Sequence, residues 1–201
     1  CFYAPPRLPP LAWANLPTAP SGTPGRANSR YSAAVAPAVS DVAHAPAVPP
    51  PQTDAVVRAR VAAADGEQPE LALLWRLREA TAVMTGLMND AGVGPDALAA
   101  DGIYSGLIPG QAAGQVVEFW VLAEGAGGGL RTLEPAPFPD RSNLVRFAAP
   151  EADAGLPRVH ILMSELNAAR LAARGIYHDG LLDATVTCGD ELFYHAGIRY
   201  R

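Results

Sequence analysis

Arg199 and Arg201 lie near the end of the sequence, in the run "GIRYR", and are separated by a single residue. Side chains of a β-strand point to alternate faces, so residues two positions apart leave the same face. Two guanidinium groups on one face can bind a phosphate or a carboxylate through paired hydrogen bonds. An ordinary solvated strand face or a structural ion pair is the alternative reading.

Trp120 is the second candidate, because it lies opposite Val117 and Phe119 in the alternating run "GQVVEFWVLAE". The ring of an exposed tryptophan can stack against a sugar, so Trp120 is a candidate ligand-binding residue. A buried Trp120 at a second interface is the open alternative. Trp75 shares a face with leucines in "ELALLWRLRE", and we expect it in the core.

The remaining polar residues lack the spacing of known sites. No histidine pair has the H-E-x-x-H pattern, and Ser164 has no G-x-S-x-G context, so we predict neither a metal site nor a catalytic triad. The glycine run "EGAGGGL" precedes no helix that could bind a phosphate, and we expect a hairpin loop there.

Asn89, Asp90, Asp96 and Asp101 gather in a Gly-rich stretch at 88–111 and invite a calcium interpretation, because calcium prefers oxygen ligands in a loop. The stretch lacks the D-x-D-x-D-G spacing of a calcium loop. Asn, Asp and Gly also favour tight turns. We therefore expect turn chemistry, with calcium binding as the alternative.

The elements that would position these residues are mostly strands. Between 38 and 134, apolar and polar residues alternate over five to nine residues, as in "DAVVRARVA", and turn residues separate the runs. Several such strands at this spacing predict an immunoglobulin-like β-sandwich. Residues 1–37 and 135–156 are rich in proline and alanine, and we interpret both as linkers.

Residues 157–201 follow a different pattern. "RVHILMS" predicts a strand, and Ser164 is a good N-cap for a helix from Glu165 to Arg174 that Gly175 would end. "ATVTC", Gly189-Asp190 and "ELFYHAGIRYR" predict a hairpin. A strand, a helix and a hairpin form too small a core alone, so we expect the truncated start of an α+β domain in a piece of a longer protein.

Composition excludes two classes of partner. The chain of 201 residues has a net charge of −5 and scattered arginines, without the clustered basic face that nucleic acid requires. No run approaches the roughly 20 apolar residues of a membrane span. We therefore expect no nucleic-acid binding and no membrane span in this sequence.

The run "LPRVHILMSELNAARL…LLDATVTCGDELFYHAGIRYR" resembles the start of the spore-coat (CotH) kinase family, which opens with a strand ending in Met-Ser, a helix, and a hairpin ending in Gly-Val/Ile-Arg-x-Arg. The segment 38–134 is similar to the immunoglobulin-like or fibronectin-like module that often precedes that domain in bacterial secreted proteins. "GTPGRANS" resembles the closing turn of a lamin-tail domain, so 1–37 would include the end of such a domain.

The resemblance implies an atypical protein kinase in the full-length protein, with ATP and Mg²⁺ as its cofactors and Arg199 and Arg201 near the nucleotide. In that family the nucleotide-contacting lysine and the metal-binding acids lie further along the chain. This chain contains no lysine, and we expect no catalytic residue, metal or cofactor in it. Its partner would be the downstream kinase-like domain, and its location secreted or at the bacterial cell surface.

Two functions stay open for the chain itself, besides that of a purely structural connector with no ligand. In the first, the sandwich is a spacer that folds alone, and residues after about Leu156 are poorly packed without their partner strands. In the second, it is a non-catalytic adhesion or carbohydrate-binding module, with a cell-surface protein or a sugar as its ligand and Trp120 in an exposed platform.

Overall fold

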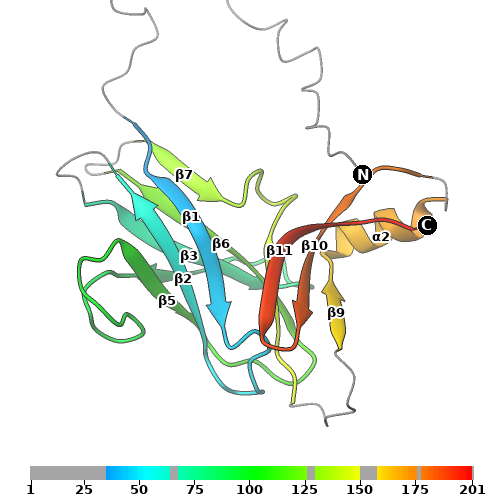
Figure 1. Cartoon of the computed structure of the whole chain (residues 1–201), viewed down its shortest axis with the longest axis horizontal. Helices are drawn as coiled ribbons and strands as arrows, with labels where there is room; N and C mark the ends of the chain where they lie inside the picture. Colours follow the sequence, from blue (N-terminus) through cyan, green and yellow to red (C-terminus); the bar gives the residue numbers. More distant parts are fainter. Residues whose placement is uncertain (1–34, 64–67, 126–129, 150–157, 176–177, 201) are drawn as a thin grey trace, which may run out of the picture. The chain divides into compact units, whose positions relative to one another are not determined.

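The computed structural model describes residues 35–63, 68–125, 130–149, 158–175 and 178–200 (Figure 1). The stretch that resembles a lamin-tail domain lies outside these residues. All the described residues belong to one unit of the chain, residues 34–201. No helix among them is long and apolar enough to cross a membrane.

The larger part of the described chain is a sandwich of two antiparallel sheets, as predicted (Figure 1). The first sheet has the order β1-β2-β5, formed by Ala38–Ala45, Ala55–Ala62 and Ile103–Ile108. The second has the order β4-β3-β6-β7, formed by Met84–Met88, Glu70–Leu77, Val116–Glu124 and Arg131–Glu134. A further strand, β8 (Asn143–Arg146), pairs with the first half of β6, while β7 pairs with the second half.

Alternation of side chains explains the core, because every second residue of a half-buried strand faces the other sheet. In β2, Val57 and Ala59 are fully buried while Arg58 and Arg60 are exposed. In β3, Trp75 is 7% exposed and belongs to the core, which confirms its expected position. Strand β6 differs, since Val117, Phe119 and Val121 face the core and its other face is buried as well.

The second face of β6 is covered by residues that the sequence suggested were a linker. The segment 135–156 contains β8, whose Leu144 and Val145 are buried, and Phe147 follows them into the core. Glu118 on this face forms an ion pair of 2.6 Å with Arg76. The described part of this segment therefore adds a strand to the second sheet, and its Phe138 and Arg141 cover Trp120 on the second face of β6.

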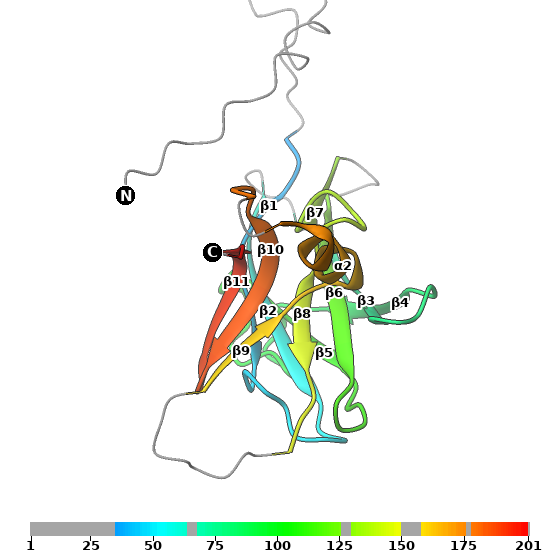
Figure 2. The ribbon, with the colours of Figure 1, turned by 90° about the vertical axis from the view of Figure 1, so that its right-hand side faces the viewer.

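The C-terminal part forms the predicted strand, helix and hairpin. These are β9 (Val159–Leu162), α2 (Glu165–Ala173), β10 (Leu182–Cys188) and β11 (Glu191–Ile198), with the strands in the order β11-β10-β9. Ser164 is the N-cap of α2, and its hydroxyl accepts a hydrogen bond from the Asn167 backbone N–H. This third sheet lies against β8 (Figure 2).

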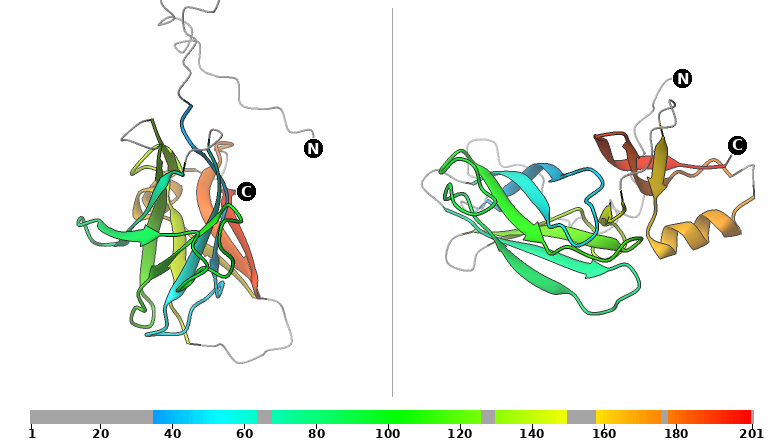
Figure 3. Two further views of the ribbon diagram at one scale, coloured as in Figure 1. Left: turned by 90° about the vertical axis from the view of Figure 1, so that its left-hand side faces the viewer. Right: turned by 90° about the horizontal axis from the view of Figure 1, so that it is seen from below.

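The third sheet closes the side of the sandwich where β1 is the edge strand. Tyr194 of β11 packs among the core residues, with its ring centroid 5.9 Å from that of Phe119. Its hydroxyl donates a hydrogen bond to His44 Nδ1 in β1. On β8, the Leu144 N–H donates to Thr185 Oγ1 of β10. Tyr194 thus joins the hairpin to the core of the sandwich, and the ribbon of the hairpin runs beside β1 (Figure 3).

Candidate functional site

Arg199, the first sequence-predicted residue, follows the last residue of β11. Its Nη1 lies 2.9 Å from Asp179 Oδ1, and the Asp179 side chain is 95% exposed. Exposed ion pairs contribute little free energy, so this one leaves the guanidinium group available for exchange. Arg201 lies outside the described residues, so only one member of the proposed arginine pair is described.

Trp120 is fully buried, and the expectation that it forms an exposed ligand platform is wrong. Its indole N–H donates to the Arg141 carbonyl at 2.5 Å, and its ring meets Phe138 edge-on at 4.8 Å between centroids. The Arg76 guanidinium carbon lies 5.5 Å from the ring centroid. The segment that precedes β8 supplies this cover, and a sugar has no access to the ring.

The acidic loop after β4 uses its carboxylates to hold its own backbone. Asp90 accepts hydrogen bonds from the N–H groups of Asp101 and Gly102, at 3.1 and 3.0 Å. Asp96 is 6% exposed and accepts from the Gly92 N–H at 2.6 Å. Within the described residues, no group of three or more His, Cys, Asp or Glu side chains could hold a metal ion. These contacts are those expected of turn chemistry.

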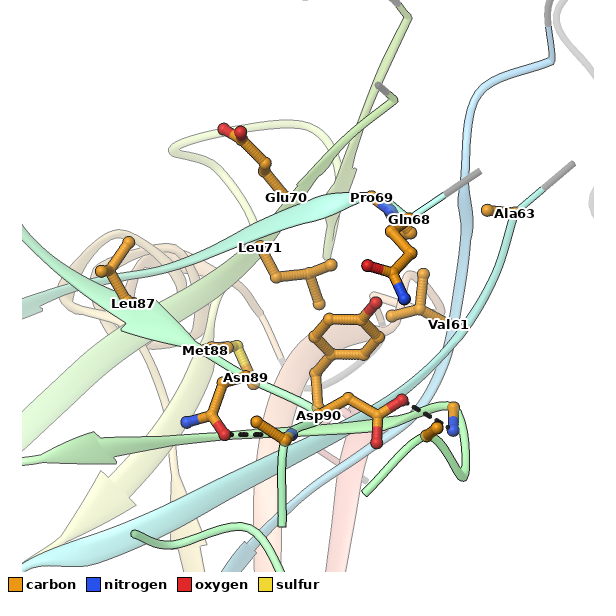
Figure 4. A pocket seen from close by; sticks show the side chains of 14 residues that line it. Val61, Ala63, Gln68, Pro69, Glu70, Leu71, Leu87, Met88, Asn89 and Asp90 are labelled. Atoms are coloured by element: carbon orange, nitrogen blue, oxygen red, sulfur yellow. Dashed lines mark hydrogen bonds between the residues drawn. The ribbon is translucent and has the colours of Figure 1, made fainter. Parts of the chain in front are cut away.

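An open groove lies beside this loop, at the end of the sandwich where β2 ends and β3 begins (Figure 4). Its volume is about 850 Å³. Figure 4 shows that Gln68 and Leu71 reach into the groove, whereas Glu70 and Leu87 point away from it. The groove is thus partly apolar, with amide groups at its edge.

Tyr104 of β5 gives this groove an aromatic wall. Burial of the phenol, together with the nearby Asp90 carboxylate, raises the pKa of Tyr104 above its usual value of 10. The hydroxyl therefore stays protonated and can donate a hydrogen bond. The groove thus combines an aromatic ring, apolar side chains, amide groups and the Asp90 carboxylate, a lining that suits a small polar ligand.

The sequence did not point to three polar residues at the place where the third sheet closes the sandwich: Asn143, His44 and Tyr194. One local signal was present: in "NLVRF", Asn143 occupies the same strand face as Val145 and Phe147, a polar residue at the head of an apolar series. His44 and Tyr194 carry no such signal, because 150 residues separate them.

Comparison with protein-family models, with curated proteins and with solved structures gave no match to this chain.

Proposed function

We propose that this chain is part of a larger secreted or cell-surface bacterial protein, in which the sandwich holds the beginning of a CotH kinase-like domain in a fixed orientation. One observation carries the proposal: the described residues cover neither face of the sheet β11-β10-β9 completely. One of its faces closes the sandwich, and α2 covers only one end of the other face.

The strand register defines the uncovered row. Val186 of β10 pairs with Ile161 of β9 on one side and with Phe193 of β11 on the other, so the three side chains leave the same face. Val159 lies on this face as well, opposite Cys188. Val159, Ile161 and Phe193 are 59%, 52% and 50% exposed.

The covered end of the same face is small. Met163, Leu182 and Ala184 are buried there, with Leu171 of α2 and Ile198 packed against them. A layered domain must bury the apolar face of each sheet, and contiguous exposed apolar surface marks an interaction site. We propose that further elements of an α+β domain pack on this exposed row.

The contacts between the sandwich and this C-terminal part support a fixed orientation. Arg78, just after β3, donates to the Met163 carbonyl at 3.3 Å and pairs with Glu165 at 3.4 Å. Arg141 pairs with Asp183 of β10, also at 3.4 Å. With Tyr194 in the sandwich core, these contacts favour a rigid support over a loose spacer.

The kinase part of the proposal depends on the resemblance. Among the described residues, only Arg199 of the expected nucleotide-contacting pair is present, and no metal-binding cluster accompanies it. ATP and Mg²⁺ belong to the proposal for the full-length protein, where Arg199 and Arg201 would approach the phosphates.

The support function is tested by Ile161→Asp in two proteins, the chain of 201 residues and the full-length protein. We expect a loss of about 0.5 kcal/mol or less of unfolding free energy in the short chain and of about 2 kcal/mol in the full-length protein, because only there is the residue covered. Leu87→Asp on exposed strand β4 is the matched control, with small losses in both. Equally small losses for Ile161→Asp in both proteins would reject the support function.

Equilibrium dialysis of MgATP against the full-length protein tests the kinase part separately. Saturable binding that Arg199→Ala weakens would support it. Absence of binding would remove the kinase part and leave the support function to the Ile161 experiment.

The groove beside Tyr104 favours a second candidate function, the binding of a carbohydrate. An aromatic wall with amide groups at the edge suits a hydroxylated ring. Screening the chain on a glycan array would test this, with Tyr104→Phe expected to retain binding and Tyr104→Ala to lose it. A sugar signal that is unchanged in Tyr104→Ala would contradict a site in this groove.

A further inference from the structure

A second cavity, of about 400 Å³, lies where β1, β7, β8 and β11 meet. Strand β1 supplies one wall and β11 another, so the cavity exists only because the third sheet closes the sandwich. Its polar lining consists of Ser40, Asp41, Glu134, Asn143, Tyr194 and His195. This cavity is distinct from the groove beside Tyr104 and from the apolar row on β9, β10 and β11.

Asn143 is the unusual member of this lining. Its side chain is buried, with 1% exposure, and neither Nδ2 nor Oδ1 has a hydrogen-bonding partner within the described residues. It pairs with Phe119 and therefore leaves the inner face of the sheet, which is otherwise apolar here. Burial of an unpartnered amide is unfavourable, and native proteins rarely retain one without a function.

Glu134 gives the same cavity a negative charge. It pairs with Val121, two positions from Phe119 along β6, so Glu134 and Asn143 leave the same inner face as neighbours. Glu134 forms no ion pair in the described part of the chain. Asp41 also lines the cavity, but it pairs with Arg60 at 3.4 Å and is largely exposed.

The remaining groups reinforce an excess of acceptors. His195 Nδ1 lies 3.1 Å from the Asp183 carboxylate and can donate a hydrogen bond to it. The other nitrogen of the neutral ring, Nε2, is then an acceptor. No arginine is among the described residues that line the cavity, and the chain has no lysine. A ligand that fits this lining must bring hydrogen-bond donors and positive charge.

From these contacts we infer that the cavity binds an arginine side chain presented by a partner polypeptide. The planar guanidinium group can donate paired hydrogen bonds to the Glu134 carboxylate and a further one to Asn143 Oδ1. Asn143 Nδ2 then donates to a backbone carbonyl of the partner. Val39 and Val42 of β1 line the same cavity and can contact the aliphatic stem. The net charge of −5 favours approach of a basic partner.

This inference does not depend on the kinase resemblance or on the proposed support function, and it is tested on the chain of 201 residues. The probe is the peptide acetyl-Gly-Arg-Gly-amide, titrated into isotope-labelled protein and followed by NMR. We expect saturable shifts of the Asn143 side-chain NH₂ group and of β1 and β11 amides. The same peptide with neutral citrulline in place of arginine should bind about tenfold or more weakly.

Two variants locate the site. Glu134→Gln should weaken binding of the arginine peptide about tenfold, whereas the matched change Glu124→Gln, near the other end of β7 where Glu124 pairs with Arg131, should leave it unchanged. Asn143→Leu should abolish binding in a protein that stays folded. Equal affinity for the arginine and citrulline peptides, unchanged binding in Glu134→Gln, or no saturable shift up to about 10 mM peptide would each overturn the inference.

Discussion

Lowering the pH should destabilise the protein through His44, which joins the sandwich to the third sheet. The side chain is 5% exposed; its Nε2–H donates to the Ala47 carbonyl at 3.1 Å, and its Nδ1 accepts from the Tyr194 hydroxyl. Both nitrogens of the neutral ring are thereby satisfied. Burial lowers the pKa of His44 from 6.5 to about 4, and the hydrogen bond to the Ala47 carbonyl opposes this decrease.

The sign follows from the proton uptake of the two states. Between pH 6.5 and pH 4 the unfolded chain binds a proton on His44 that the folded chain does not, so protonation favours unfolding in this window. The stabilising contribution is complete above about pH 6.5 and falls as the pH approaches 4. With these two pKa values, His44 alone should remove about 2 kcal/mol between pH 7 and pH 5 and about 3 kcal/mol by pH 4.

Urea unfolding at pH 7 and pH 5 measures this effect in the natural chain and in His44→Phe. Phenylalanine fills the volume of the ring but has no titrating nitrogen, so the variant should have a lower free energy of unfolding at pH 7. Between pH 7 and pH 5, the free energy of unfolding should fall by about 2 kcal/mol less in the variant than in the natural chain. Tyr194→Phe, which removes only the hydroxyl, should keep most of the pH dependence. Identical pH dependence in the natural chain and His44→Phe would refute the reasoning.

Three further predictions concern buried or capped residues. Trp120→Ala should cost about 4 kcal/mol of unfolding free energy because the indole is fully buried, whereas a loss below about 1 kcal/mol in thermal or urea unfolding would contradict that burial. Arg76→Ala should lower the unfolding free energy by about 3 kcal/mol, because it leaves the 4%-exposed Glu118 carboxylate without its cation. The double variant Arg76→Ala, Glu118→Gln should recover part of this loss, and no recovery would show that the charge is not the cause. Ser164→Ala should cost about 1 kcal/mol and increase amide exchange in the first turn of α2, while Ser164→Asp should preserve the cap; equal exchange in all three proteins would show that the cap contributes nothing.

The sequence predicts those parts of the fold in which a local pattern and the tertiary environment agree. Strands β2 and β3 were predictable because one face of each meets the core and the alternation is visible in neighbouring residues. Helix α2 was predictable because Ser164 caps it and its residues favour helix. The hairpin β10–β11 follows from its Gly189-Asp190 turn.

The parts that could not be predicted depend on residues far apart in the chain. Trp120 lies on the strand face that alternation assigns to solvent, and only the cover from Phe138 and Arg141 buries it. The prolines of 135–139 suggested a linker and obscured β8 a few residues later. Both cavities have walls from several strands, so their composition depends on strand register and on packing between sheets.

The contact between His44 and Tyr194 also bears on how the protein is made. Since 150 residues separate the two, the ribosome completes β1 long before it produces the strand that covers this edge. Contacts of such high sequence separation slow folding, and an unpaired strand edge can pair with another chain in the interval. A protein truncated before β11 during synthesis should therefore aggregate more readily than the chain that carries Tyr194.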